Sequence, residues 1–201
     1  MKKLIVSAFL IMVAFPCISQ NSDCKYDKNE VDKFTHKKIL WTKWEKLTTL
    51  FGNLKEYVPQ VRFVKEDTLK QLILFVDGYY YTNFKPTKED IDSAKIIPAG
   101  SKLIILLEDQ KSYELATAKP LNSSGDYVSP YTGDNKSEKY QVHWHIGIQY
   151  PLDEFAIKML LAQGATAMRV YFGKDTYSDY NIHKKKYNTF QQLISCINAQ
   201  D

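Results

Sequence analysis

A strict alternation of apolar and polar residues between positions 140 and 150 is the clearest pattern in the chain. Alternation with a period of two is typical of a β-strand that buries one of its faces. The residues expected on the core face are Val142, Trp144, Ile146 and Ile148, and those expected on the opposite, more exposed face are His143, His145, Gly147 and Gln149.

Other segments also have the composition of strands. Residues 102–107 and 112–118 predict the clearest hairpin, with a turn over 108–111. Asp77-Gly78 is a strong turn signal, which should separate one strand from the next. The remaining strands are expected within 34–47 and over 61–64, 72–76, 79–82 and 166–172.

Two segments in the C-terminal half have helical periodicity. The first follows Pro151, which suits the first turn of a helix, and Gly164 is placed to cap its end. Its expected buried face consists of Leu152, Phe155, Ala156, Met159 and Leu160. The second helix is expected from about 180 to 198, and its buried stripe consists of Phe190, Leu193, Ile194 and Ile197.

Two polar stretches interrupt these elements. Residues 20–33 are expected to form a polar leader strapped onto the folded body. Residues 119–139 are dense in Ser, Gly, Pro, Asn and Asp and should form the longest irregular segment, and segments of that kind are often functional. The whole pattern predicts an α+β fold, with a mainly antiparallel curved sheet or sandwich and two helices in the C-terminal half.

The first nineteen residues have the layout of a secretory signal peptide. Lys2 and Lys3 precede an apolar run over 4–15, which is shorter than the roughly 20 residues that a transmembrane helix needs. Cleavage after Ser19 would leave a single β-rich domain over 20–201. We therefore expect a secreted or periplasmic protein with no transmembrane anchor in its mature form. Acylation at Cys17, as in a lipoprotein, is the alternative, and the local sequence matches it less well.

Charge and composition narrow the possible partners. The net charge is +4, and loss of Lys2 and Lys3 with the signal peptide lowers it to +2. So small a charge, together with export, argues against a nucleic-acid partner. Abundant aromatic residues and modest numbers of Gly and Pro favour a folded domain.

Two cysteines remain after cleavage, Cys24 and Cys196. In an exported protein an even pair favours a disulfide, which would stabilise the fold by roughly 4–5 kcal/mol in the chain-entropy model. Two unpaired thiols are the alternative.

The two ends of the mature chain resemble small secreted proteins of Gram-negative bacteria. The similarity lies in Cys24-Lys25-Tyr26-Asp27-Lys28-Asn29-Glu30-Val31-Asp32-Lys33-Phe34-Thr35, in Met168-Arg169-Val170-Tyr171, and in the Lys-rich helix that carries Cys196. The resemblance implies a compact extracytoplasmic β-rich domain and brings no particular activity.

His143 and His145 are the candidate metal ligands. Residues two apart in a strand point the same way, so both imidazoles could bind one ion. His183, His36 or a loop carboxylate could serve as a third ligand. The alternative is that the pair simply occupies the wetter face of its strand.

The polar residues form no spacing typical of catalysis. The chain lacks GxSxG, HExxH and phosphate-binding glycine motifs, so the sequence implies neither a catalytic residue nor a cofactor. Glycosidase carboxylates can lie anywhere in a chain. A hydrolase whose site is not visible in the sequence therefore stays open as an alternative.

Aromatic residues are the candidates for ligand binding. Tyr127 and Tyr131 lie in the polar stretch over 119–139, and Tyr80 is the middle residue of three consecutive tyrosines. Trp41 and Trp44 could add to such a platform, although aromatic residues more often pack within sheets. The sequence thus favours a non-catalytic binding or structural module whose ligand is a protein, a peptide or a glycan. A metal-binding protein that uses His143 and His145 is a further alternative.

Overall fold

A seven-stranded antiparallel sheet is the largest element of the computed structural model, which describes residues 24–48, 59–93, 95–132 and 138–199. Its strands follow the order β1-β2-β4-β5-β11-β10, and β3 also pairs with β4. The bounds are β1 (Tyr26–Val31), β2 (Lys38–Thr42), β3 (Glu45–Lys46), β4 (Gln60–Glu66), β5 (Leu69–Thr82), β10 (Ser124–Thr132) and β11 (Glu138–Pro151).

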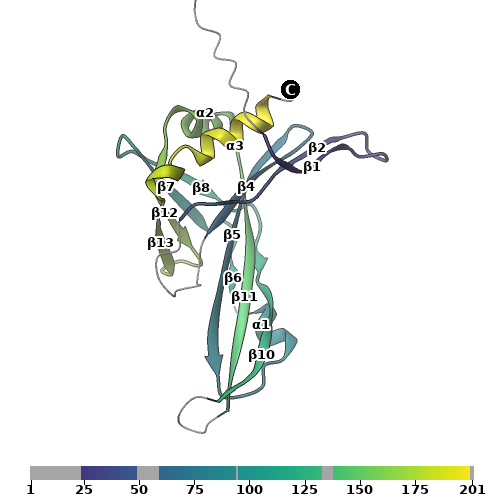
Figure 1. Ribbon diagram of the computed structural model, residues 1–201, viewed down its shortest axis with the longest axis vertical. Helices are drawn as coiled ribbons and strands as arrows, with labels where there is room; N and C mark the ends of the chain where they lie inside the picture. The colour runs from purple at the N-terminus through teal and green to yellow at the C-terminus, as the bar shows by residue number, and fades with distance from the viewer. Residues whose placement is uncertain (1–23, 49–58, 94, 133–137, 200–201) are drawn as a thin grey trace, which may run out of the picture.

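The strands β5 and β11 give the molecule its elongated form. Each has 14 residues, and their far ends leave the main body together with β10 (Figure 1). We call this extension the arm; it contains 77–82 of β5, 138–145 of β11, all of β10, and the short helix α1 (Lys88–Asp92). A capping box between Thr87 and Asp90 closes the first turn of α1, which satisfies backbone donors that such a short helix would otherwise leave open.

The remaining elements form the body. A four-stranded sheet has the order β13-β12-β7-β8, and a two-stranded sheet joins β6 to β9. Two helices lie at the top of the body in Figure 1, and a 3₁₀ turn precedes the second of them along the chain. The bounds are β6 (Ile96–Ile97), β7 (Lys102–Leu107), β8 (Ser112–Ala116), β9 (Leu121–Asn122), α2 (Glu154–Ala162), β12 (Ala165–Tyr171), β13 (Tyr177–Asn181), η1 (Lys184–Lys186) and α3 (Thr189–Asn198). This arrangement confirms the α+β prediction.

The core lies between the large sheet, the four-stranded sheet and the helices α2 and α3. Phe63 on β4 meets Phe190 on α3 edge to face, with ring centroids 6.1 Å apart. The alternation in β11 is confirmed, because Val142, Trp144, Ile146 and Ile148 are buried. The stripe of α3 is confirmed too, since Phe190, Leu193, Ile194 and Ile197 are all buried.

The disulfide is also confirmed. Cys24 and Cys196 are bonded, with their Cα atoms 5.5 Å apart. Beside the bond, the Tyr26 hydroxyl donates a hydrogen bond of 2.9 Å to the Cys196 carbonyl oxygen. These contacts tie β1, an edge strand, to α3. No helix in the described ranges is long and apolar enough to cross a membrane.

The turn expected at Asp77-Gly78 was wrong, because β5 runs through both residues without a break. Asp77 pairs with His145, and Gly78 pairs with Trp144. On the other side of β11, Gly125 also pairs with Trp144. Both glycines therefore lie within paired strands, and a side chain at Gly125 would collide with the backbone of His143 and Trp144. Long-range pairing thus overrides the local turn signal.

The expected irregular segment over 119–139 was wrong as well. It contains β9, β10 and the start of β11, while 133–137 lie outside the described residues. The leader expected over 20–33 likewise contains β1. Both β1 and β10 are edge strands. An edge strand with little buried surface needs no apolar alternation, so its sequence resembles a loop.

The helix boundaries need three corrections. The segment expected to be one helix over 180–198 comprises the end of β13, then η1 and then α3. Pro151 ends β11, and α2 begins after its N-cap Asp153, whose side chain accepts a hydrogen bond from the Ala156 backbone N–H. The α2 C-cap is Gln163 in an extended conformation, so Gly164 does not cap the helix. Phe155 is 60% exposed rather than buried, because it lies on the outer side of α2.

Tyr150 is the one fully buried phenol of the described core. Its side chain is 0% exposed, and its hydroxyl has no hydrogen-bond partner. An unsatisfied buried hydroxyl costs about 1–3 kcal/mol of desolvation. Burial also raises the pKa of Tyr150 well above its ordinary value, because the apolar surroundings disfavour the phenolate.

Replacing Tyr150 by Phe is therefore expected to stabilise the protein by about 1 kcal/mol, since the unpaired hydroxyl disappears and only a small void remains. Above about pH 10 the unfolded chain ionises this phenol while the folded chain keeps it neutral. The contribution of Tyr150 to stability should be constant below that pH and fall above it, and Tyr150→Phe should reduce the loss of stability at high pH. Urea unfolding at pH 7 and at pH 10.5 measures both effects, with Tyr113→Phe as the half-buried control. A variant less stable than the native protein at both pH values would contradict this account.

Candidate functional site

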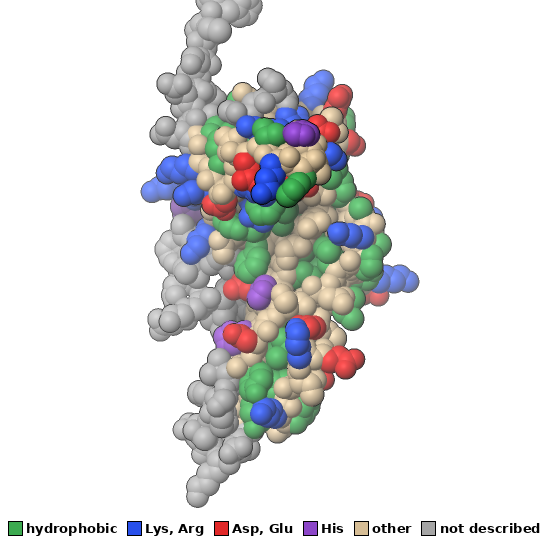
Figure 2. Space-filling view, turned by 90° about the vertical axis from the view of Figure 1, so that its right-hand side faces the viewer, with side chains coloured by type: hydrophobic (Ala, Val, Ile, Leu, Met, Phe, Trp, Pro, Cys, Tyr) green, Lys and Arg blue, Asp and Glu red, His purple; other side chains and the backbone are tan. Residues whose placement is uncertain are grey.

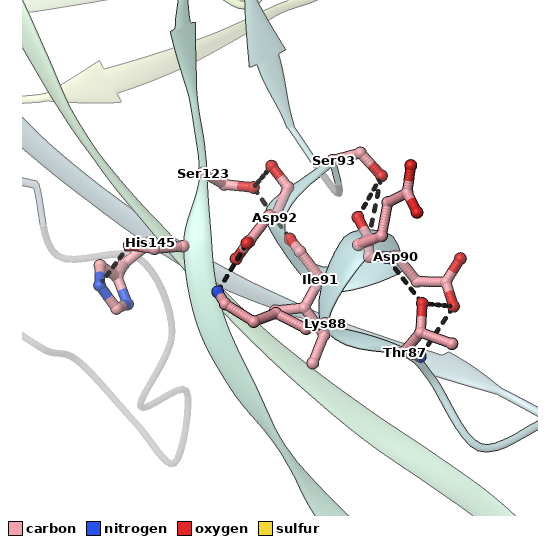
Figure 3. A network of polar contacts seen from close by, with 10 residues as sticks. Thr87, Lys88, Asp90, Ile91, Asp92, Ser93, Ser123 and His145 are labelled. Carbon is pink, nitrogen blue, oxygen red and sulfur yellow. Dashed lines mark hydrogen bonds and ion pairs between the residues drawn. The ribbon is translucent and has the colours of Figure 1, made fainter.

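The large sheet has one face that no described helix or second sheet covers. Phe63 points to the side on which α3 packs, and residues of opposite parity on the same strands point the other way. On the arm, α1 and its polar contacts lie on one side of the strands, and His145 lies on the other (Figure 3). We call the side that carries His145 the outer face.

A cation–π ladder occupies the body end of the outer face. The Arg62 guanidinium lies between two indole rings, 4.6 Å from the centroid of Trp41 and 4.3 Å from that of Trp44. The Lys28 ammonium lies 5.2 Å from the Trp41 ring, and the nearest carboxylate of Arg62 is Asp27 at 4.0 Å. Burial lowers the pKa of Arg62, and Asp27 opposes that shift. Even so, an arginine stays charged at any physiological pH.

Ring contacts, rather than hydrogen bonds, hold this ladder together. The Arg62 Nε and the Trp41 Nε1 are both buried without a hydrogen-bond partner. The guanidinium is therefore fixed by the electron-rich faces of the two rings and by the distant charge of Asp27.

The ladder continues into aromatic contacts across β5 and β11. Trp44 meets Phe75 edge to face, with ring centroids 5.8 Å apart. The Phe75 ring stacks on His145 at 5.6 Å and an interplanar angle of 28°. Ser124 on β10 fixes the far side of that imidazole through a hydrogen bond of 2.9 Å between its Oγ and Nε2 of His145. Gly147 lies directly opposite Phe75 on the neighbouring strand.

Three more rings lie further along the arm. The Tyr79 and Tyr81 rings are 5.5 Å apart with an angle of 73°, and Tyr79 lies 6.1 Å from His143. Tyr81 is 48% exposed, and His145 is also exposed. We call the whole row the aromatic stripe; its members are Trp41, Trp44, Phe75, Tyr79, Tyr81, His143 and His145.

The histidine pair shares one face, as predicted, but the other expected ligands lie elsewhere. His36 is in the turn between β1 and β2, and His183 caps η1 through a hydrogen bond from the Lys185 backbone N–H. Within 24–48, 59–93, 95–132 and 138–199, no group of three or more His, Cys, Asp or Glu side chains is placed to hold a metal ion. The geometry of His143 and His145 therefore gives metal binding no support.

Two of the three tyrosines expected to bind ligand, Tyr80 and Tyr127, lie on the opposite side of the arm. Tyr80 and Tyr127 both pair with Val142, and so they face the side on which α1 packs. Tyr127 meets Tyr140 at 6.0 Å, and burial raises the pKa of Tyr80. Tyr131 lies in β10 opposite Lys139, and its side chain is outside the described residues. The contacts of Tyr80 and Tyr127 match the alternative interpretation, in which aromatic residues pack within the sheet.

Sequence reasoning singled out Trp41, Trp44 and the histidine pair. Of the three consecutive tyrosines it chose Tyr80 rather than Tyr79 and Tyr81, and it missed Phe75. Tyr79 and Tyr81 are two residues apart, which is the spacing that places both on one face of a strand. That signal was present in the sequence. The link between this tyrosine pair and His143 depends on the pairing of β5 with β11, which brings Tyr79 opposite His143.

A separate shallow pocket of about 430 Å³ lies at the end of the four-stranded sheet. Its wall includes Tyr171, Lys102 and Lys174. The Lys102 ammonium forms an ion pair of 3.0 Å with Glu114, so it is already compensated. The pocket has no residue in common with the aromatic stripe.

Comparison of the chain with family models, with curated proteins and with solved structures finds no significant match.

Proposed function

We propose that this protein is a non-catalytic binding module that works outside the cytoplasm and holds a protein, peptide or glycan ligand on its outer face. The aromatic stripe carries this proposal. Partly exposed rings follow one another across three strands, on a face that no described helix or second sheet covers. Aromatic rings at a surface supply large contact areas at low cost in conformational entropy, and they are enriched where proteins bind ligands.

An extracytoplasmic location is supported by the bond between Cys24 and Cys196, because structural disulfides persist mainly in oxidising compartments. The expected signal peptide, which begins with Lys2 and Lys3, also supports an extracytoplasmic location. We propose secretion or a periplasmic location on these grounds.

A panel of glycans and peptides tests the proposal. We expect a ligand found in the panel to bind Tyr81→Ala at least about tenfold more weakly, because tyrosine is enriched among the residues that contribute more than about 1 kcal/mol to an interface. Tyr177→Ala is the matched control, since Tyr177 is also 48% exposed but lies on β13; that variant should bind normally. Equal affinities for the native protein and Tyr81→Ala would contradict the proposal, as would turnover of a panel compound.

A further inference from the structure

Two carboxylates lie among the rings of the arm. The register places Asp77 directly opposite His145, and Asp126 directly opposite His143. All four side chains therefore point to the outer face. Figure 2 shows histidine side chains next to acidic ones on the flank of the molecule.

This part of the outer face has a net negative charge. In the described part of the chain, the carboxylates of Asp77 and Asp126 form no ion pair and accept no side-chain hydrogen bond. The outward residues of β11 from Gln141 to Gln149, and those opposite them on β5 and β10, include no lysine or arginine. Arg62 marks one end of this area, where two indole rings hold it, and Lys139 marks the other.

The tyrosine rings beside these carboxylates also attract positively charged groups. Tyr79 and Tyr81 stand at 73° to one another, and Tyr81 is 48% exposed. The faces of such rings attract ammonium and guanidinium groups, with arginine the more frequent partner. Carboxylates and aromatic faces therefore recognise the same kind of group at this surface.

From this complementarity of charge we infer that the outer face of the arm docks a basic segment of a partner protein, whose lysine or arginine side chains reach Asp77 and Asp126 and pack on Tyr79 and Tyr81. This inference rests on the proposed function and names the partner's chemistry. An extended segment suits the geometry, because the two carboxylates lie on β5 and β10, with β11 between them.

Two labelled peptides of equal length test the inference by fluorescence anisotropy, one with lysine and arginine alternating with serine, and the other with glutamate in the basic positions. The chain as a whole has a net charge of +4, so unspecific attraction would favour the acidic peptide. We expect the protein to prefer the basic peptide by about tenfold or more, and that binding should weaken as salt is added.

Charge-neutral variants then locate the contact. Asp77→Asn with Asp126→Asn should weaken binding of the basic peptide by about tenfold. Asp175→Asn, which removes an exposed carboxylate between β12 and β13, should change it by less than about twofold. Urea unfolding of each variant checks that the fold is intact.

Three outcomes would overturn the inference. The first is no preference for the basic peptide, and the second is binding that the double variant leaves unchanged. The third is self-association in sedimentation experiments that the double variant abolishes, which would make a second copy the occupant. Binding of a neutral glycan that is lost in Tyr81→Ala but kept in the double variant would overturn only this inference, and the proposed function would stand. Ligand binding that is kept in both Tyr81→Ala and the double variant would overturn this inference and the proposed function alike.

Discussion

Removing the disulfide is expected to lower the free energy of unfolding by about 3–5 kcal/mol. Cys24 and Cys196 are 172 residues apart in the chain, so the bond restricts the unfolded ensemble over nearly the whole domain. The chain-entropy model gives about 5 kcal/mol for so long a loop, and measured values often fall below the model. Urea unfolding of the Cys24→Ser, Cys196→Ser double variant, compared with the oxidised native protein, measures the loss.

Two controls separate the covalent bond from its neighbouring contact. Tyr26→Phe removes only the hydrogen bond to the Cys196 carbonyl oxygen, and it should cost about 1 kcal/mol. Adding a reductant should destabilise the native protein and leave the double variant unchanged. A double variant within 1 kcal/mol of the oxidised protein would show that other contacts already hold β1 against α3.

Local patterns predicted the elements whose two faces differ clearly. The hairpin of β7 and β8, the alternation of β11 and the stripe of α3 all bury one face and expose the other, so hydrophobic periodicity identifies them. The edge strand β1 buries little on either face, and the polar sequences of β1 and β10 resemble loops. At Asp77-Gly78 the local signal was strong, and a long-range contact overrode it.

The aromatic stripe depends on contacts between distant parts of the sequence. Tyr79 and His143 are 64 positions apart, and Arg62 lies between tryptophans that precede it by about 20 residues. Side-chain parity within one strand can be read from the sequence, but the register between strands cannot, because several pairings would satisfy the same alternation. The histidine pair was therefore predictable, while its ring and carboxylate neighbours were not.

The cation–π ladder gives a further prediction, that Arg62→Ala destabilises the protein by about 2–3 kcal/mol. The substitution removes two ring contacts, each worth about 0.5–2 kcal/mol, and it also removes the apolar stem that packs between the indoles. Trp41 and Trp44 should become more exposed to water. Since the third tryptophan, Trp144, is buried in the core, a red shift in tryptophan emission without unfolding would report on the ladder.

Two further variants separate the contributions of the Arg62 charge, its apolar stem and its surroundings to the free energy of unfolding. Arg62→Met keeps most of the stem and loses the charge, so we expect it to cost about half as much as the alanine variant. Arg169→Ala is the comparison, because Arg169 forms a bidentate ion pair with Asp179 and contacts a single, exposed ring, that of Tyr177, at 4.1 Å. Exposed ion pairs contribute about 1 kcal/mol or less. If urea unfolding gives equal losses for Arg62→Ala and Arg169→Ala, the two indole rings do not stabilise the guanidinium, and the body end of the aromatic stripe is held by the backbone pairing of its strands alone.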